Sequence, residues 1–181
     1  MLKLAVLVGS LRQESINLKY ARALEKLGAG HFGFHFVDMS LPLYNDDLWQ
    51  DPPAKVRQLK VDLAAADGVL IVTPEYNRSM PAVTKNAIDW ASRPYGHNAW
   101  KGKPVALTGA SHGSQGTAVA QSQLRSTLVI LETVLMGGPE VYITFAPELV
   151  DANYDVTNEG TAKFLKGFLD AFGKWIDMVK K

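Results

Sequence analysis

The sequence predicts an α/β fold in which a parallel sheet of five strands, in the order 2-1-3-4-5, carries helices on both faces. Two observations indicate this fold. Short apolar runs alternate along the chain with segments whose apolar residues recur at helical spacing. The first run, Leu2–Val8, is apolar at nearly every position, which is typical of a strand buried on both faces. A sheet covered on both sides by helices accounts for both patterns.

The elements of the first half follow in order from this alternation. After the strand Leu2–Val8 we expect a helix over about 18–27 and a strand over 32–39, where apolar and other residues alternate. Turn-forming residues over 41–53 indicate a surface loop. Apolar residues spaced by three and four then predict a helix over 54–66.

The second half repeats the alternation. The stripe formed by Leu124, Leu128, Leu131 and Leu135 predicts the fourth helix. A broad apolar stripe predicts a last helix that packs on the sheet. The remaining expected elements are strands over 68–73, 103–109 and 140–145 and helices over 81–91 and 161–179.

Composition bounds what the protein can do. Its 181 residues fit one domain over 1–181, and a formal net charge of +1 argues against binding to nucleic acid or to an anionic membrane. No run approaches the roughly 18 apolar residues that span a bilayer, and no signal peptide is recognised, so we expect a cytoplasmic protein. The absence of cysteine excludes disulfides, thiolate metal sites and cysteine nucleophiles. Redox chemistry would therefore need a cofactor.

The expected topology also predicts where a ligand binds. Sheets of this kind hold ligands at the carboxyl ends of their strands, close to the point where the strand order reverses. Polar, Gly-rich or Pro-rich loops over 9–17, 74–80 and 109–117 all fall at that edge. We therefore expect the site where these three loops meet.

The first of these loops has the donors of a phosphate site. Gly9 permits a sharp turn, and Ser10, Ser15 and Asn17 can donate to phosphate oxygens, while Arg12 can form a charge-assisted pair. The following helix start adds free N–H groups and partial positive charge. The alternative is an ordinary capped turn in which Ser15 or Asn17 is the N-cap and Arg12 lies in solvent.

Other phosphate-binding and α/β classes fit this sequence less well. A dinucleotide site would need G-x-G-x-x-G, but only Gly9 is present, although Asp38 near the end of strand two is compatible with one. Receiver domains need acidic residues after strand one and an aspartate at the end of strand three, where this chain has Gly9-Ser10 and Thr73-Pro74. Phosphatases that depend on cysteine are excluded. A terminal monophosphate, as in FMN, suits the loop best.

Three motifs carry a family resemblance. The segment GSLRQESIN resembles the G-S-x-R-x-x-S-x-N loop of the NADPH-dependent FMN reductase family, especially its quinone and chromate reductase branch. The stretch Thr73–Trp90, TPEYNRSMPAVTKNAIDW, is similar to the second motif of that family, and Pro42–Leu48 matches a loop often found between strand two and helix two. The resemblance implies a flavodoxin-like three-layer sandwich that binds FMN and forms a homodimer or homotetramer.

The resemblance also implies a set of cofactor-binding residues. The first loop would hold the phosphate, the second would contact the flavin ring largely through backbone groups, and small residues of the third would let the backbone approach the ring. No protein residue is assigned to catalysis, because the chemistry takes place on FMN, and no metal is expected. The FMN-binding residues would be Ser10, Arg12, Ser15, Ile16, Asn17, Pro74, Glu75, Tyr76, Asn77, Ser111, His112 and Gly113.

Several of these positions have more than one interpretation. Glu14 stands inside the phosphate loop, where it would repel phosphate unless it points outward or pairs with Arg12. Glu75 could cap the next helix or form an ion pair between subunits, and Arg78 could attract the phosphate of NADPH or be solvated. His112 could protonate a reduced quinone or be an exposed loop residue. A family arginine is replaced by Val119 in this chain, although Arg125 is kept.

The third helix and the segment after it carry residues of open role. A polar set could bind a neighbouring loop, and an aromatic set could form core, a subunit interface or a wall of the substrate pocket; we favour the interface. The polar set is Lys85, Asn86 and Asp89, and the aromatic set is Trp90, Tyr95 and Trp100.

The resulting functional hypothesis is an FMN-dependent NAD(P)H oxidoreductase that passes two electrons to a small-molecule acceptor. Quinones are the expected acceptors, with chromate, azo compounds and free flavin as others, and NAD(P)H is the co-substrate. One alternative is a flavodoxin-like electron carrier that turns over no substrate. Such carriers tend to be strongly acidic, and the net charge of +1 argues against one. A flavin-free nucleotide-binding or regulatory domain is the other alternative.

Overall fold

The strands form a parallel sheet in the order β2-β1-β3-β4-β5, which confirms the predicted order. The structure is a computed structural model that describes residues 1–180. A sixth strand, β6, pairs with β4 beyond the end of β5. The strands are β1 (Leu2–Val8), β2 (Phe32–Phe36), β3 (Gly68–Val72), β4 (Pro104–Ser111), β5 (Val134–Leu135) and β6 (Tyr142–Thr144).

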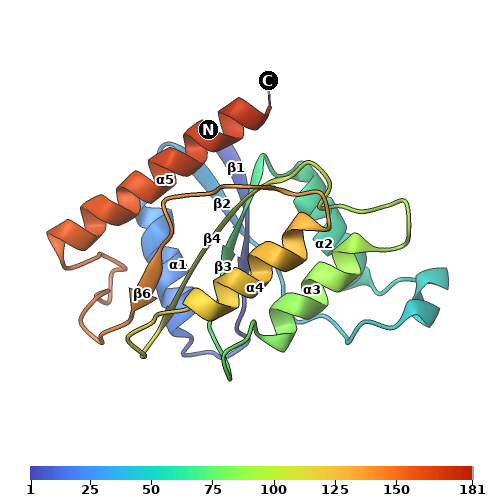
Figure 1. The fold of residues 1–181 in the computed structure, drawn as a ribbon, viewed down its shortest axis with the longest axis horizontal. Coiled ribbons are helices and arrows are strands. Elements are labelled where there is room, and N and C mark those ends of the chain that lie inside the picture. Colours follow the sequence, from blue (N-terminus) through green and yellow to red (C-terminus); the bar gives the residue numbers. More distant parts are fainter. Residues whose placement is uncertain (181) are drawn as a thin grey trace.

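Helices cover both faces of the sheet, as Figure 1 shows. One face carries α1 and α5, and the other carries α2, α3 and α4, so the sheet is the middle of three layers. A short 3-10 helix, η1, lies in the loop before α2. The helices are α1 (Ile16–Leu27), η1 (Asp46–Gln50), α2 (Ala54–Ala65), α3 (Ala82–Ser92), α4 (Ala118–Val129) and α5 (Glu159–Val179).

The burial of β1 on both faces explains why its sequence is apolar. Leu4 and Val6 belong to the core beneath α1 and α5, whereas Ala5 and Leu7 belong to the core beneath α2, α3 and α4. All four side chains are buried. Because successive residues of a strand point to opposite faces, a strand covered on both sides must be apolar throughout.

The fourth helix is shorter than its apolar spacing predicts. It ends at Val129, so Leu131 lies beyond it and Leu135 belongs to β5. Glu132 adopts a φ of 60°, and its carbonyl accepts a hydrogen bond of 2.8 Å from the Gly102 N–H. This left-handed residue reverses the chain. The leucine spacing therefore continued through a turn that periodicity alone does not reveal.

The fifth position of the sheet is divided between two short strands. β5 pairs with the start of β4, at Pro104 and Val105, and β6 pairs with its end, at Gly109–Ser111. The predicted strand over 140–145 corresponds to β6 but is shorter. β4 itself extends two residues past its expected end, so Ser111 closes the strand rather than opening the loop.

The other boundaries differ by a few residues. β2 ends at Phe36 instead of position 39. α1 begins at Ile16, where Ser15 caps it, and α5 begins at Glu159, where the Asn158 side chain accepts from the Thr161 N–H at 2.9 Å. Both caps lie outside the apolar stripes, which is why the stripes placed the helix starts too late.

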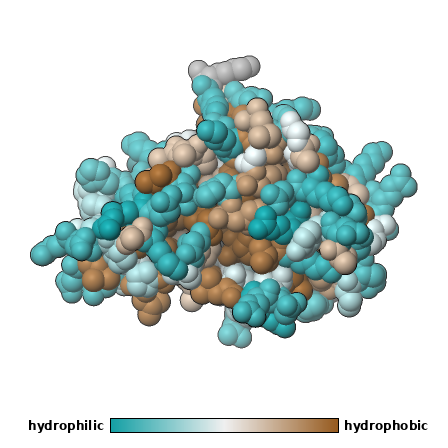
Figure 2. Space-filling model, turned by 180° about the vertical axis from the view of Figure 1, so that it is seen from behind, coloured by the Kyte–Doolittle hydropathy of each residue, from teal (hydrophilic) through white to brown (hydrophobic). Residues whose placement is uncertain are grey.

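The surface opposite the view of Figure 1 has an apolar area at its centre, surrounded by hydrophilic side chains (Figure 2). A pocket of about 380 Å³ lies between β2 and α2 and includes Phe34, Ala65 and Ala66. Within residues 1–180, no helix combines the length and the apolarity needed to cross a bilayer. The same part of the chain contains no group of three or more His, Asp and Glu arranged to hold a metal ion.

Candidate functional site

The loops that follow β1, β3 and β4 meet at the carboxyl edge of the sheet. They enclose a pocket of about 220 Å³. It brings together residues from all three predicted loops, and Asn77 and Gly113 line the adjoining pocket instead. The lining residues are Ser10, Arg12, Ser15, Ile16, Asn17, Pro74, Glu75, Tyr76, Ala110, Ser111 and His112.

Gly9 lets the first loop pack against its neighbours. A Cβ atom at this position would lie 2.4 Å from Thr84 Oγ1 and 2.9 Å from Pro74 Cδ. Such distances are too short for non-bonded atoms, so a larger residue would push the loop away from the start of α3. The absence of a side chain therefore sets the distance between the first and second loops.

The polar residues of the first loop combine two expected roles. Ser15 is the N-cap of α1, because its hydroxyl oxygen accepts from the Leu18 N–H at 3.3 Å. Arg12 is exposed, as the capped-turn interpretation requires, but it also lines the pocket. A capping hydroxyl accepts from the helix and keeps its own proton for a ligand. Capping and anion binding are thus compatible here.

Asn17 has a structural partner that the sequence did not indicate. Its Nδ2 donates to the Ala110 carbonyl at 2.8 Å, and its Oδ1 accepts from the Ala110 N–H at 2.9 Å. The side chain is buried. This paired contact fixes the first turn of α1 against the end of β4, while the backbone N–H of Asn17 lies in the helix start.

Two carboxylates near the site are directed elsewhere. Glu14 lines a neighbouring pocket of about 540 Å³ with Lys19 and Tyr154, and within residues 1–180 it forms no ion pair with Arg12. Asp38 pairs with Lys55 at 2.9 Å and accepts from the Ser40 N–H at 2.8 Å. These contacts, with Lys55 first, lower the pKa of Asp38 to about 2. Asp38 is thus engaged outside the pocket.

The second loop is a tight hairpin. Tyr76 and Ser79 exchange backbone hydrogen bonds of 3.1 and 2.9 Å. Asn77 and Arg78 between them have φ values of 50° and 59°. Positive φ at both central residues is the geometry of a type I′ turn, which usually contains glycine. The turn places Tyr76 at the pocket with 56% of its surface exposed.

Glu75 caps a helix, but a different one from the helix that follows it in sequence. Its Oε2 accepts from the N–H groups of Val119 and Ala120 in α4, each at 3.0 Å. The side chain is only 9% exposed. A carboxylate at a helix start is stabilised by the partial positive charge there. The contact joins the second loop to the first turn of α4 at Val119 and Ala120.

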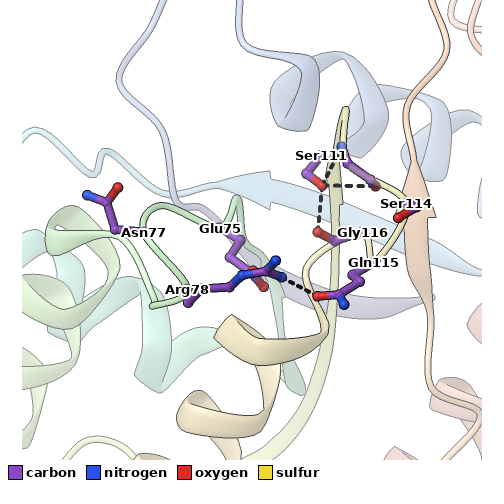
Figure 3. A pocket seen from close by; sticks show the side chains of 8 residues that line it. Glu75, Asn77, Arg78, Ser111, Ser114, Gln115 and Gly116 are labelled. Atoms are coloured by element: carbon purple, nitrogen blue, oxygen red, sulfur yellow. Dashed lines mark hydrogen bonds and ion pairs between the residues drawn. The ribbon is translucent and has the colours of Figure 1, made fainter.

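Arg78 bridges the second and third loops, as Figure 3 shows. Its Nη1 donates to Gln115 Oε1 and lies 3.7 Å from Glu75 Oε1. Its carbonyl accepts from Gln123 Nε2 at 3.1 Å. Arg78, Glu75 and Gln115 line a second pocket of about 420 Å³ that also includes Ser111 and Gly116. The two pockets share the lining residues Glu75 and Ser111 and therefore adjoin each other.

The third loop is folded around Ser111. Its hydroxyl donates to the Gly116 carbonyl at 2.5 Å and accepts from the Gly113 N–H at 3.2 Å. His112 Nδ1 lies 3.1 Å from the Phe145 carbonyl oxygen. A carbonyl only accepts, so Nδ1 carries a proton and Nε2 of the neutral ring has none. His112 is exposed and lines the pocket, so both interpretations of it fit its position.

The aromatic residues near α3 divide into core and surface. Trp90 and Trp100 are fully buried, so the expectation that they form a subunit interface or a pocket wall is wrong for both. Tyr95 is 96% exposed. Asn86 does bind a neighbouring loop, through the Tyr44 N–H and the Pro42 carbonyl. The other two members of the polar set, Lys85 and Asp89, form an ion pair with each other at 2.8 Å.

Sequence reasoning missed three positions of the site. Ala110 offers only backbone groups, which no sequence pattern marks. Gln115 lies just before α4 and Gln123 lies on it, and both amides hydrogen-bond to Arg78 of the hairpin. A polar residue at a helix start that faces the edge of the site is the one signal that could have indicated Gln115.

The chain is similar to known proteins in both sequence and structure. Residues 2–148 match the family model of NADPH-dependent FMN reductase. The chain is 51% identical to a 2-hydroxy-1,4-benzoquinone reductase from a Burkholderia species, over 97% of this chain and 96% of the relative. It is 40% identical to a quinone reductase from Escherichia coli K12, over 99% and 97% of the two chains.

Solved structures give a consistent result. The flavoenzyme FerB, an NAD(P)H:(acceptor) oxidoreductase from Paracoccus denitrificans, is 51% identical and superposes with a TM-score of 0.96 over 98% of each chain. A flavodoxin mutant from Pseudomonas aeruginosa is 18% identical, with a TM-score of 0.62 over 97% of this chain and 99% of the flavodoxin. That second likeness concerns the fold alone.

Proposed function

The chain belongs to the NADPH-dependent FMN reductase family, and from this premise we propose that it is an FMN-dependent NAD(P)H oxidoreductase that reduces quinones by two electrons. One observation carries the proposal for the site. The loops after β1, β3 and β4 meet in one pocket that combines hydroxyl, guanidinium and helix-start donors with an exposed aromatic ring.

The donor set fits a phosphate monoester. Ser10, Arg12 and Ser15 supply two hydroxyls and a guanidinium, and the N–H groups of Ile16 and Asn17 stand at the start of α1, where the helix offers them no acceptor. An anion at this point is further stabilised by the helix dipole. We assign these five residues to the FMN phosphate.

The neighbouring surface fits a flat ring. Tyr76 offers an exposed aromatic face, and Pro74, Asn77 and the third loop supply rigid backbone near it. Gly113 is exposed and lets the backbone come close to a ligand. The residues that we assign to the flavin ring, and to the part of FMN that links the ring to the phosphate, are Pro74, Glu75, Tyr76, Asn77, Ser111, His112 and Gly113.

Bound FMN would supply the redox chemistry by accepting a hydride from NAD(P)H and passing two electrons to the quinone. The protein orients the reactants, and no protein side chain is needed for the hydride step. His112 is held with Nδ1–H toward the Phe145 carbonyl, so Nε2 is the atom that can take up a proton from solvent and then donate it to a reduced quinone. We propose this role for His112.

The decisive experiment combines a spectrum with a turnover assay. The purified protein incubated with FMN should show the visible absorption of bound flavin after desalting. It should then oxidise NADH or NADPH continuously in the presence of 1,4-benzoquinone. Flavin binding without turnover would indicate an electron carrier, and a protein that stays colourless would remove the proposal altogether.

We propose further that residues 1–181 act as one FMN-binding domain and that the enzyme is a cytoplasmic homodimer or homotetramer. Exposed apolar side chains support the oligomer, among them Tyr95 at 96%, Ile130 at 79% and Val129 at 63% exposure. Sedimentation velocity of the FMN-loaded protein would determine its oligomeric state, and a monomer at micromolar concentration would contradict this part of the proposal.

A further inference from the structure

Arg78 is a cation whose charge is only partly neutralised. The nearest carboxylate, Glu75, gives its Oε2 to two α4 amides at 3.0 Å and approaches Arg78 only through Oε1, at 3.7 Å. The helix start thus stabilises the Glu75 charge. The Arg78 side chain remains 66% exposed beside the pocket of about 420 Å³.

The backbone holds Arg78 in a defined place. Its φ of 59° belongs to the type I′ turn, and Gln123 fixes the turn from α4 through the Arg78 carbonyl and the Ser79 hydroxyl, at 3.1 and 2.7 Å. Gln115 accepts one guanidinium hydrogen bond from across the pocket (Figure 3). A guanidinium has five N–H donors, so most of them remain available to a ligand.

We propose that Arg78 selects quinones that carry a negative charge, namely those with an ionised hydroxyl conjugated to a ring carbonyl. Such a hydroxyquinone is a vinylogous carboxylic acid, so its anion spreads over two oxygens as a carboxylate does. A planar guanidinium binds a delocalised oxyanion through paired N–H donors. This inference rests on the proposed function and adds the class of quinone and the residue that recognises it.

The location of Arg78 suits this role. Its pocket adjoins the proposed flavin pocket, because Glu75 and Ser111 line both. Tyr76 lies two residues before Arg78 in the same hairpin and lines the pocket assigned to the flavin ring, so a ring bound against Tyr76 would lie close to Arg78. A quinone that stacked on the outer face of the flavin ring would have its charged oxygen near Arg78 and its reducible ring against the flavin.

The test compares two quinones that differ by one hydroxyl. The kcat/KM values for 2-hydroxy-1,4-benzoquinone, an anion at pH 7, and for neutral 1,4-benzoquinone are measured with NADH for the wild type, Arg78→Gln and Arg78→Lys. We expect Arg78→Gln to lower the preference for the anionic quinone about tenfold or more, and Arg78→Lys to retain part of it. Arg57 is an exposed arginine of α2 that pairs with Asp51 and lines neither pocket, so Arg57→Gln should leave the preference unchanged.

Each other outcome overturns the assignment. Equal losses for both quinones would make Arg78 a residue of the fold or of flavin binding, which the FMN spectrum and the melting temperature of each variant would reveal. A KM increase for NADPH but not for NADH would place the nucleotide phosphate at Arg78 instead. Wild-type turnover of the neutral quinone is the separate test of the proposed function, because it does not depend on Arg78.

Discussion

Asn17 and Ala110 are joined by two hydrogen bonds, of 2.8 and 2.9 Å, that fasten the first turn of α1 to the end of β4. The two residues are 93 positions apart in the chain. The contact therefore fixes the distance between the proposed phosphate-binding turn and the loop that follows β4.

Replacing this amide tests its structural role. Asn17→Ala leaves a buried N–H and a buried carbonyl without partners, so we expect the free energy of unfolding to fall by about 2–4 kcal/mol. Urea unfolding followed by circular dichroism measures the change. Asn153→Ala, at an exposed turn residue, should shift stability by less than about 0.5 kcal/mol. Equal effects of the two substitutions would contradict this role.

Arg12→Ala tests the phosphate assignment. The loss of one charge-assisted hydrogen bond should weaken FMN binding by about 1.5–3 kcal/mol, without a comparable loss of stability because Arg12 is exposed. The quenching of FMN fluorescence gives the dissociation constant. Arg57→Ala is the matched control, and an unchanged constant for Arg12→Ala would remove this residue from the site.

Glu75→Gln tests the link between the second loop and α4. The amide can still accept hydrogen bonds but loses its attraction to the helix start, so a loss of about 1 kcal/mol of stability is expected. Glu75→Ala, which leaves both α4 amides unpartnered, should cost more. Glu148→Gln, at an exposed carboxylate, serves as the control in the same unfolding experiment. Stability unaffected by either Glu75 variant would mean that the cap contributes nothing.

A pair of glycines tests the close approach of β3 and β4. A Cβ at Gly109 would lie 1.9 Å from the Thr73 carbonyl oxygen, so Gly109→Ala should destabilise the protein by about 3 kcal/mol or more. Gly167 in α5 has no atom within 4 Å of such a Cβ. Gly167→Ala should therefore stabilise the protein by roughly 0.5–1 kcal/mol. Melting temperatures that move in the same direction would refute the packing argument.

The lowered pKa of Asp38 predicts a dependence of stability on pH. The pKa in the folded state is about 2, below the usual value near 4 for an unfolded chain. The carboxylate therefore stabilises the fold above about pH 4, and this contribution is lost as the pH falls toward 2. Asp38→Asn should flatten the decline in unfolding free energy over that window. Because the pair with Lys55 is exposed, 1 M salt should reduce the difference.

The topology was predictable because it depends on patterns that the chain displays locally. Strands that are apolar throughout and helices with one apolar face specify the layers, and the layers place three polar loops at one edge. The residues that line the pocket followed from that edge and from the motifs Gly9–Asn17 and Thr73–Trp90.

The features that the sequence did not predict depend on contacts between residues far apart in the chain or on backbone conformation. The sequence around Asn17 predicts a residue at a helix start, but it does not indicate that the Asn17 side chain hydrogen-bonds to Ala110. From the sequence, Glu75 could cap the helix that follows it, whereas in the fold its carboxylate accepts from the start of α4. Glu132 has a left-handed backbone, and because it is not a glycine the sequence gives no sign of the turn there. The leucine spacing therefore predicted a fourth helix that extends past its observed end.

The division of the fifth sheet position affects more than topology. Between its contacts with β5 and β6, no strand formed by residues 1–180 lies beside Ala106–Thr108 on the outer side of β4. There the Thr108 hydroxyl and Gln121 Nε2 donate to the Val141 carbonyl instead, at 3.3 and 2.9 Å. A strand of another molecule could therefore pair here only with the two residues of β5 or the three residues of β6, which are separated by this side-chain network. Because uninterrupted borders are the sites where sheets of separate molecules join, this border resists that kind of aggregation.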